Sequence, residues 1–336
     1  MTAPPTGVEA CCAVLYGDPL VELLAGDSLH PGGLATTRRL LSAARLSPGR
    51  PILDAGCGLG AGSRLAALEF GLLVDACDVS VEAVRRAQVL ADNARAAVRF
   101  AVASVLALPY ADGSFSGALV ECVLSTTTRA EALEELRRVI EPGGTLLISD
   151  VVARAGPAIP EPLASVLCLS RAWLPGELEE AARSAGFAVE RSWDESPAIS
   201  GLIDRIEARA SLLSAVARDV RGSDGRRPAI DGRFGLGTDS RALTGLLNEI
   251  RRLVDGGQIG YRALIARAAR PVREGRRGSA PLAPRRAFGR HRSAGPECAA
   301  SPDGRAGEHG PRQAGSAARM NPGRSSAWLR PRRVSR

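Results

Sequence analysis

Pro51-Ile52-Leu53-Asp54-Ala55-Gly56-Cys57-Gly58-Leu59-Gly60 is the stretch that decides the fold of this chain of 336 residues. Its first four residues predict a short buried strand, and the three alternating glycines predict a turn that opens a helix at residues 63–70. Glycines in such a turn let the backbone approach a ligand closely, and the start of the next helix offers free N–H groups. The pattern therefore predicts a ligand site at the end of the strand.

Downstream of this turn, short apolar runs alternate with amphipathic helical patterns. The predicted strands cover residues 72–77, 98–103, 117–122, 145–151 and 187–191, and the predicted helices cover residues 80–90, 131–140 and 178–184. Strands that alternate with helices are typical of βαβ units and of a parallel sheet. We therefore predict an α/β fold with a doubly wound, Rossmann-like, mostly parallel sheet.

The segments on either side of this core have different patterns. The N-terminal segment predicts helices that are interrupted at His30-Pro31-Gly32-Gly33, and two further helical patterns follow the core at residues 198–221 and 240–270. The last segment is rich in Arg, Gly and Pro and poor in large apolar side chains, so we expect disorder there. The expected organisation is a helical N-terminal cap (1–49), a core (50–195), a helical C-terminal extension (196–271) and a tail (272–336).

The basic charge of the chain is concentrated in the tail. All 44 basic residues are arginines, and 15 of them lie in the tail together with only four acidic residues. Residues 1–271 hold 29 basic and 32 acidic residues, so the part that we expect to fold is slightly acidic. A strongly basic segment is typical of proteins that bind nucleic acids. That expectation applies here only to the tail.

Cysteine usage and hydropathy argue against several other classes of protein. The seven cysteines include no C-x-x-C pair, which argues against a zinc site and a disulfide framework, and we expect no bound metal. The chain has no leader pattern and no apolar run of about 18 residues, so we expect a cytoplasmic protein without a membrane partner. The sequence makes no prediction of the oligomeric state.

Two classes of ligand fit the glycine turn. Gly56-x-Gly58-x-x-Ala61 also satisfies the dinucleotide-binding pattern, with Asp78 as the acid that contacts a ribose. Asp54, however, stands two residues before the first glycine, where a carboxylate repels a pyrophosphate and attracts the ammonium of an amino-acid moiety. Asp54 therefore favours a ligand that carries an amino-acid group.

Further motifs follow the glycine turn in a fixed order. They are Asp78-Val79-Ser80, Leu108-Pro109-Tyr110-Ala111-Asp112-Gly113-Ser114-Phe115 and Leu136-Arg137-Arg138-Val139-Ile140-Glu141-Pro142-Gly143-Gly144. With the glycine turn, they make residues 50–192 resemble the class I S-adenosylmethionine (SAM)-dependent methyltransferases. The resemblance is to the small-molecule group that includes quinone-biosynthesis and arsenite-type enzymes. It implies SAM as the cofactor and a small molecule as the methyl acceptor.

The resemblance also implies a role for residues at the strand ends. Asp54 would hold the amino group of SAM, Asp78 would accept hydrogen bonds from both ribose hydroxyls, and Ser104 and Val105 would lie beside the adenine. The family commonly has acids where this chain has Ser104 and Ser116, so we expect weaker SAM binding than usual. The implied SAM-binding residues are Asp54, Ala55, Gly56, Cys57, Gly58, Gly60, Asp78, Val79, Ser104, Val105 and Glu121.

The residues on the acceptor side follow from the same resemblance. Glu121 and Cys122, at the end of a predicted strand, would face the sulfonium and the acceptor. His30 precedes the core in a Pro-Gly-Gly turn, and two interpretations stay open: contact with the acceptor, or a solvent-exposed loop residue. The candidate catalytic residues are His30, Glu121 and Cys122. Cys11-Cys12 and Cys122 raise the hypothesis of arsenite binding, but the cysteine spacing of the arsenite enzymes is not evident.

Three functions therefore stay open. The leading hypothesis is an enzyme that transfers a methyl group from SAM to a small molecule. The serines at positions 104 and 116, and the lack of an obvious general base, leave room for a non-catalytic SAM-binding or interaction module. The third hypothesis is an RNA methyltransferase that holds its substrate through the basic tail.

Overall fold

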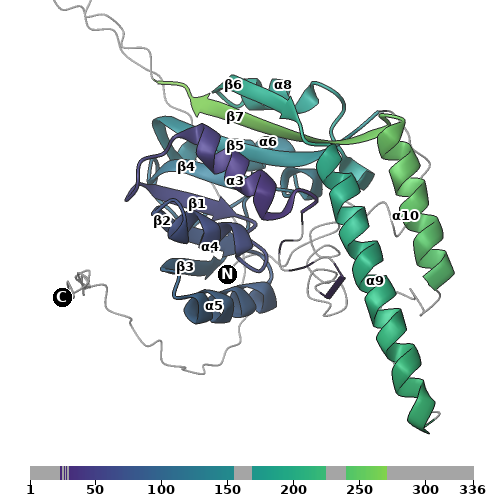
Figure 1. Ribbon diagram of the computed structural model, residues 1–336. Coiled ribbons are helices and arrows are strands. Elements are labelled where there is room, and N and C mark those ends of the chain that lie inside the picture. The colour runs from purple at the N-terminus through teal and green to yellow at the C-terminus, as the bar shows by residue number, and fades with distance from the viewer. Residues whose placement is uncertain are drawn as a thin grey trace, which may run out of the picture. The chain divides into compact units, whose positions relative to one another are not determined.

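The computed structural model describes residues 23–24, 26, 28, 30–154, 169–224 and 240–270. Within these residues lies one seven-stranded sheet (Figure 1). Its strands are β1 (Pro51–Ala55), β2 (Leu73–Asp78), β3 (Val98–Val102), β4 (Phe115–Glu121), β5 (Ile140–Ala153), β6 (Phe187–Asp194) and β7 (Ile259–Ala268). The order across the sheet is β3-β2-β1-β4-β5-β7-β6, and β7 runs antiparallel to both of its neighbours. The prediction of a doubly wound, mostly parallel sheet is confirmed.

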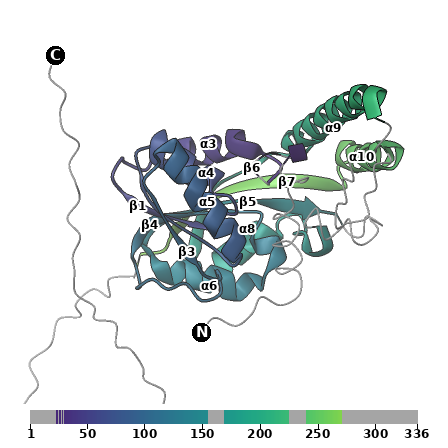
Figure 2. The ribbon, with the colours of Figure 1, turned by 90° about the horizontal axis from the view of Figure 1, so that it is seen from below.

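Helices cover both faces of this sheet. They are α3 (Gly33–Ala44), α4 (Ala61–Leu68), α5 (Val81–Ala94), α6 (Arg129–Val139), α8 (Glu177–Ser184), α9 (Pro197–Asp224) and α10 (Ser240–Asp255), with short 3-10 turns η1 (Leu124–Thr126) and η2 (Leu169–Arg171). Successive strand residues point to opposite faces, so Ile52 packs with Leu41 and Leu65 on one side. Its neighbour Leu53 packs with Leu136 on the other. Figure 2 shows the resulting layers, with α3, α4 and α5 on one face and α6 on the other.

The strand order creates one natural place for a ligand. The sheet continues from β1 through β2 to β3 on one side and through β4 to β5 on the other. Because these strands are parallel, β1, β2 and β4 end at the same edge, at Ala55, Asp78 and Glu121. Ligands in open α/β sheets bind at the point where the strand order reverses. The turn that follows β1 lies at that point.

The segment 240–270 corrects the sequence prediction. Its first part is helical as expected in α10, but the expected helix is wrong for Ile259–Ala268, which form β7. This strand lies between β5 and β6, where Leu147 pairs with Ile265 and Val189 with Ala266. It is buried along almost its whole length, and such strands have near-continuous apolar sequences without clear alternation. The last strand of the sheet therefore comes from the predicted helical extension.

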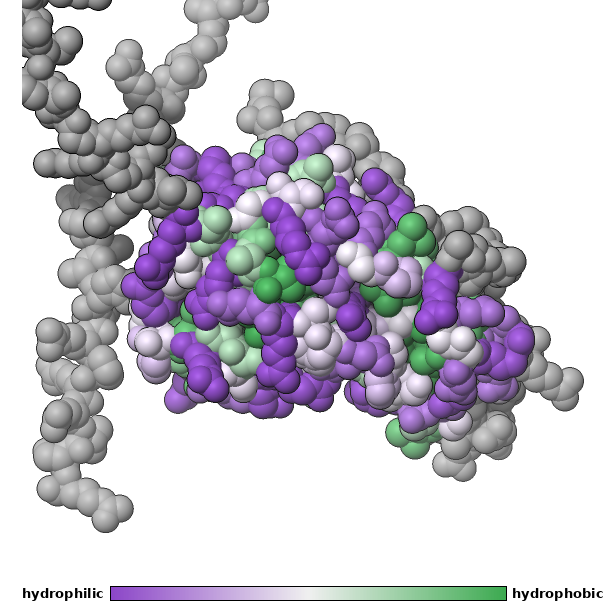
Figure 3. Space-filling view, turned by 90° about the horizontal axis from the view of Figure 1, so that it is seen from above, coloured by the Kyte–Doolittle hydropathy of each residue, from purple (hydrophilic) through white to green (hydrophobic). Residues whose placement is uncertain are grey.

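The outer segments are described only in part. The break at His30-Pro31-Gly32-Gly33 precedes α3 as expected, whereas the predicted helix before residue 23 and the predicted disorder of residues 272–336 lie outside the described residues. No helix in the described part of the chain is long and apolar enough to span a membrane. Figure 3 shows mostly hydrophilic residues on the face seen from above, with hydrophobic residues between them.

Candidate functional site

The glycine turn between β1 and α4 has the backbone conformation that the sequence predicts. Gly56, Gly58 and Gly60 have positive φ angles of 75°, 52° and 70°, which side-chain-bearing residues rarely adopt. A Cβ on Gly56 would lie 2.3 Å from Cγ2 of Val123, so only glycine fits there. The backbone N–H of Gly56 donates to the carbonyl of Cys77 over 2.8 Å and so ties the turn to the end of β2.

Asp78 ends β2 and faces the same turn. Its Oδ2 accepts a hydrogen bond from the backbone N–H of Gly58 at 2.9 Å, and its Oδ1 accepts one from Ser80 at 2.9 Å. Ser80 in turn caps α5, because its hydroxyl oxygen accepts from the N–H of Ala83. The carboxylate is therefore fixed beside the glycines. An ionised carboxylate has about four acceptor sites, so it can accept further hydrogen bonds.

Asp54 is buried at the end of β1, just before the turn. Its carboxyl group accepts a hydrogen bond from the hydroxyl of Ser63 in α4. Burial raises the pKa of Asp54 to about 7, the Ser63 hydrogen bond opposes the shift, and the charges of Glu121 and Asp78 add to it. Three carboxyl groups from three strand ends therefore act on one another here. Such a region favours a ligand that carries positive charge.

The remaining predicted donor residues lie along the same edge. Ser104 follows β3, and its hydroxyl oxygen accepts from the N–H of Leu106 at 3.1 Å. Val105 is buried with Ala55 in the core, so it lies beneath the edge. Val79 and Cys57 are half-buried, and burial raises the pKa of the Cys57 thiol well above its usual range. The assignment of these residues to SAM contacts stays a prediction.

Ser116 lies at the opposite edge of the sheet. It stands at the start of β4, where its hydroxyl donates to the carbonyl of Pro51 at the start of β1. Both residues are at the N-terminal ends of parallel strands, whereas Asp54, Asp78 and Glu121 are at or near the C-terminal ends. The serine therefore joins two strands, and its position gives no reason to expect weaker SAM binding.

Glu121, at the end of β4, and His30 form a buried polar cluster. The Glu121 carboxylate accepts hydrogen bonds from Thr37 at 2.8 Å and Ser149 at 2.9 Å, and its Oε2 lies 3.4 Å from Nε2 of His30. The His30 side chain is only 11% exposed, so the interpretation of His30 as a solvent-exposed loop residue is wrong. The structure therefore brings together these two candidate catalytic residues.

The two groups do not form an ordinary ion pair. Burial raises the pKa of Glu121 to about 7, against the hydrogen bonds from Thr37 and Ser149, and the charge of Glu195 raises it further. Burial and the nearby Arg205 lower the pKa of His30 to about 4. His30 is therefore neutral at neutral pH, and Glu121 exchanges its proton there. A group with a pKa near the working pH suits general acid–base chemistry.

Tyr261 and Cys122 complete this cluster, and sequence reasoning missed the tyrosine. Tyr261 is fully buried on β7, and its hydroxyl donates to Ser149 at 2.8 Å. The same oxygen lies 3.5 Å from Nδ1 of His30 and 3.5 Å from Sγ of Cys122. Cys122 has a positive φ of 54°, which is rare for a residue with a side chain and is common near functional sites. Because the segment of Tyr261 was expected to be helical, no sequence signal placed this residue here.

The cysteines and other potential metal ligands give no second site. Cys57, Cys77 and Cys122 form no disulfide within the described residues, whereas Cys11-Cys12 of the arsenite hypothesis lie outside them. No group of three or more His, Cys, Asp or Glu residues with the geometry of a metal site occurs in the described ranges.

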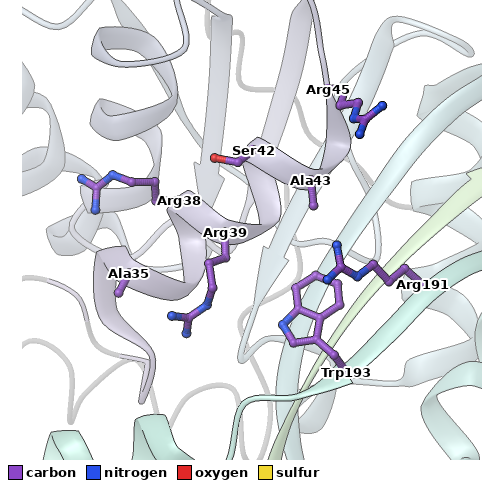
Figure 4. A pocket seen from close by; sticks show the side chains of 8 residues that line it. All are labelled: Ala35, Arg38, Arg39, Ser42, Ala43, Arg45, Arg191 and Trp193. Atoms are coloured by element: carbon purple, nitrogen blue, oxygen red, sulfur yellow. The ribbon is translucent and has the colours of Figure 1, made fainter.

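A separate hollow of about 570 Å³ lies on the exposed side of α3 (Figure 4). It is lined by Ala35, Arg38, Arg39, Ser42, Ala43, Arg45, Arg191 and Trp193. Arg39 binds the buried Glu195 from this side, and Arg191 lies 4.9 Å from the ring centre of Trp193. Thr37, which reaches Glu121, is on the buried side of the same helix. The hollow is therefore distinct from the strand-end site.

Known proteins resemble this chain in sequence and in fold. The family model for a methyltransferase domain matches residues 53–148. The O-methyltransferase resE of Aspergillus sclerotiorum is 33% identical over 235 residues, which cover 63% of this chain and 88% of that protein. The 2-methyl-6-phytyl-1,4-hydroquinone methyltransferase of Synechocystis is 37% identical over 144 residues, or 40% of this chain and 42% of the relative.

Solved structures agree on the fold. Phosphoethanolamine N-methyltransferase 2 of Haemonchus contortus, solved with S-adenosyl-L-methionine, aligns with a TM-score of 0.62 and 18% identity, over 79% of this chain and 61% of that one. Several curated relatives are matched over only about half of their own length, with coverages of 47%, 42% and 54%.

Proposed function

The chain belongs to the class I SAM-dependent methyltransferases, whose cofactor is SAM, and we propose that it methylates a hydroxyl group of a small molecule. The proposal divides the strand-end site into a donor side and an acceptor side. The donor side comprises the glycine turn with Asp54 and Asp78, and the acceptor side comprises Glu121 and His30.

The observation that carries the donor side is the pair of carboxyl groups, Asp54 and Asp78, beside a turn that requires glycine. SAM carries an ammonium, a sulfonium and two ribose hydroxyls, and the residues fit these groups. Asp78 accepts a hydrogen bond from the N–H of Gly58, and Asp54 accepts one from Ser63 at the start of α4. We assign Asp54 to the ammonium and Asp78 to the ribose hydroxyls. Ser104 and Val105, which follow the next strand, are assigned to the adenine.

The acceptor side supports a hydroxyl as the methylated group. Bound SAM supplies an electrophilic methyl group on a sulfonium. The residues of this chain align the acceptor, exclude water and take up the proton of its hydroxyl group. The electron pair of the broken O–H bond stays on the oxygen, which forms the new O–CH3 bond. His30 Nε2 and Glu121 Oε2 are 3.4 Å apart, and together they take that proton. The name of one relative, an O-methyltransferase, supports the same acceptor class.

The donor side is tested by SAM binding to Asp78→Asn, measured by calorimetry. Loss of a charge-assisted acceptor is expected to weaken binding by about 1.5–3 kcal/mol, or roughly 10- to 100-fold. Asp92→Asn on α5 is the matched control, because the Asp92 side chain bonds the neighbouring Gln88 and lies outside the strand-end site, and this variant should bind SAM as the wild type does. Unchanged binding by Asp78→Asn contradicts the ribose assignment.

The acceptor side is tested by S-adenosylhomocysteine release against a panel of phenols, enols and aliphatic alcohols, with amines and thiols as comparison. Release with hydroxyl compounds, and its loss in His30→Gln and Glu121→Gln, is the expected result. Release with amines or thiols alone contradicts the acceptor class. Tight SAM binding without turnover on any compound supports the non-catalytic module instead.

A further inference from the structure

Four arginines from two separate elements line the hollow on the exposed side of α3. Arg38 and Arg39 belong to α3, Arg45 directly follows it, and Arg191 comes from β6, the edge strand of the sheet. The side chains between the arginines on the helix are small, and they are Ala35, Ser42 and Ala43. The arginines therefore surround a hollow of about 570 Å³, and Figure 4 shows Arg191 extending across the Trp193 ring toward α3.

Two of the four arginines already have carboxylate partners. Arg38 donates two hydrogen bonds to Glu69, which follows α4, and Arg39 pairs with the buried Glu195. Arg45 and Arg191 form no ion pair with another residue in the described part of the chain. Two positive charges that these carboxylates do not neutralise therefore line the same hollow.

The wall that carries Arg191 is held in place from below. Glu195 is only 5% exposed, and it accepts hydrogen bonds from Nε1 of Trp193 at 2.6 Å and from Nε of Arg39 at 2.8 Å. The indole ring that these bonds orient supports the guanidinium of Arg191, which lies 4.9 Å from the ring centre. A guanidinium that rests on a ring still has N–H groups at its edge for a ligand. Binding an anion therefore requires little new ordering of this wall.

We propose that the hollow binds a small molecule that carries a phosphate monoester, with Arg45 and Arg191 as the residues that bind the phosphate. Guanidinium groups donate paired N–H bonds to phosphate oxygens, and a monoester carries close to two negative charges at pH 8. Its charge therefore matches the two arginines that have no carboxylate partner. The volume of the hollow leaves room for the rest of a small molecule.

The surroundings favour a small molecule over a nucleic acid. A phosphodiester chain follows a continuous basic surface, whereas Glu69 and Glu195 lie directly beside Arg38 and Arg39. The strand-end site offers no alternative place for a phosphate, because the carboxyl groups of Asp54 and Asp78 act on each other there and repel an anion. The hollow is thus a second site, and its ligand differs in charge from SAM.

The site is tested by calorimetry of the full chain at pH 8, with phenyl phosphate as the probe and saturating S-adenosylhomocysteine to fill the strand-end site. We expect saturable binding that Arg45→Gln and Arg191→Gln each weaken about tenfold. Arg85→Gln is the matched control, because Arg85 is an exposed arginine on α5 outside the hollow, and it should bind as the wild type does. Diphenyl phosphate, a diester with a single negative charge, should bind more weakly than the monoester.

The variants change exposed side chains, so thermal unfolding should show that both remain folded. If Arg191→Gln is not folded, Arg45→Gln decides the test. The absence of saturable binding, or binding that the folded variants leave unchanged, overturns the proposal. Binding of phosphatidic acid vesicles or single-stranded RNA through these arginines, without binding of phenyl phosphate, overturns the small-molecule assignment. No methyl acceptor takes part in this experiment, so its outcome is independent of the proposed function.

Discussion

The carboxylate of Glu121, at the end of β4, lies 3.4 Å from Nε2 of His30, which precedes the first helix that covers the sheet. The two residues are 91 positions apart in the sequence, and the pKa of each differs from its ordinary value. Burial raises the pKa of Glu121 to about 7 and lowers that of His30 to about 4. The fold therefore stabilises the neutral forms of both groups. Their ionisation is linked to the stability of the protein.

Replacement of Glu121 by Gln is expected to stabilise the protein at pH 8 while it abolishes methyl transfer. The pKa of Glu121 is raised from 4.5 to about 7 on folding, so the folded chain keeps a proton that the unfolded chain has already lost. This contribution to stability is present below pH 4.5 and is lost as the pH rises through 7. The amide avoids that loss, and we expect a gain of about 1–3 kcal/mol at pH 8 and little at pH 4. Thermal unfolding at both pH values measures the difference.

Glu141→Gln is the control for this experiment. Glu141 is 39% exposed and pairs with Arg50 at the surface, where such pairs contribute little. Its replacement should shift the unfolding temperature by a similar small amount at both pH values. A Glu121→Gln variant that is less stable than the wild type at pH 8 contradicts the raised pKa.

The affinity for SAM should increase as the pH rises from 5.5 to 7. The Asp54 carboxyl group has a pKa of about 7 in the free protein, and only its ionised form attracts the SAM ammonium. Binding therefore lowers this pKa and releases a proton, and Kd falls up to tenfold per pH unit until Asp54 is ionised. Above about pH 7.7 the effect ends, because the α-amino group of the ligand loses its own proton.

Calorimetry in two buffers of different ionisation enthalpy counts the released protons. In Asp54→Asn, SAM should bind more weakly, and most of the pH dependence below pH 7 should disappear. Asp92→Asn should retain the wild-type profile. A wild type whose affinity is constant from pH 5.5 to 7 would show that Asp54 is already ionised without the ligand.

The sequence placed the residues that we propose for the donor side at one edge of the sheet, because their signals are local. The glycine turn, Asp54 and Asp78 all lie within 25 residues of one another, at the ends of strands whose apolar patterns are short and clear. The carboxyl ends of parallel strands meet at one edge of the sheet, and this does not depend on the sequence of the other segments. Glu121 was found for the same reason. Ser116 does not belong to this set, because a residue at the start of a strand lies at the opposite edge.

The acceptor side depends on contacts between distant segments. Tyr261 is 112 residues from Ser149 and 231 from His30, and it reaches them only because β7 enters the sheet between β5 and β6. β7 is buried on both faces of the sheet, so its sequence shows no clear alternation, and its pairing depends on the strands beside it. Gly256-Gly257, with a positive φ at Gly257, was the one local signal that the helix ends before this segment. The burial of His30 likewise follows from its contacts with distant residues rather than from the sequence of the turn that contains it.

Gly56→Ala is expected to destabilise the protein by about 2–4 kcal/mol more than Gly49→Ala. Both glycines have similar positive φ angles, 75° and 79°, so the backbone cost of about 1 kcal/mol is common to both. The new methyl group of Gly56→Ala meets Val123 at 2.3 Å, whereas nothing lies within 4 Å of a Cβ at position 49. Urea unfolding measures the free energy of unfolding of both variants. Adding Val123→Ala to Gly56→Ala should recover part of the stability that Gly56→Ala loses. Equal costs for the two variants would contradict the close contact with Val123.

Deletion of residues 272–336 tests whether the basic tail takes part in substrate recognition. The last described strand ends at Ala268, and the N–H of Ala269 still binds the carbonyl of Gly186, so the cut lies beyond the last contacts of the sheet. We expect SAM affinity and turnover of a small hydroxyl compound to stay within about twofold of the wild type. The 15 arginines that are lost would form the electrostatic contacts to RNA phosphates, so any RNA affinity should be lost with the tail, together with its steep dependence on salt. Binding to single-stranded RNA at several salt concentrations measures this, with turnover assayed in parallel. RNA methylation by the full chain, and its loss in the truncated one, would contradict the small-molecule acceptor and assign the substrate to the tail.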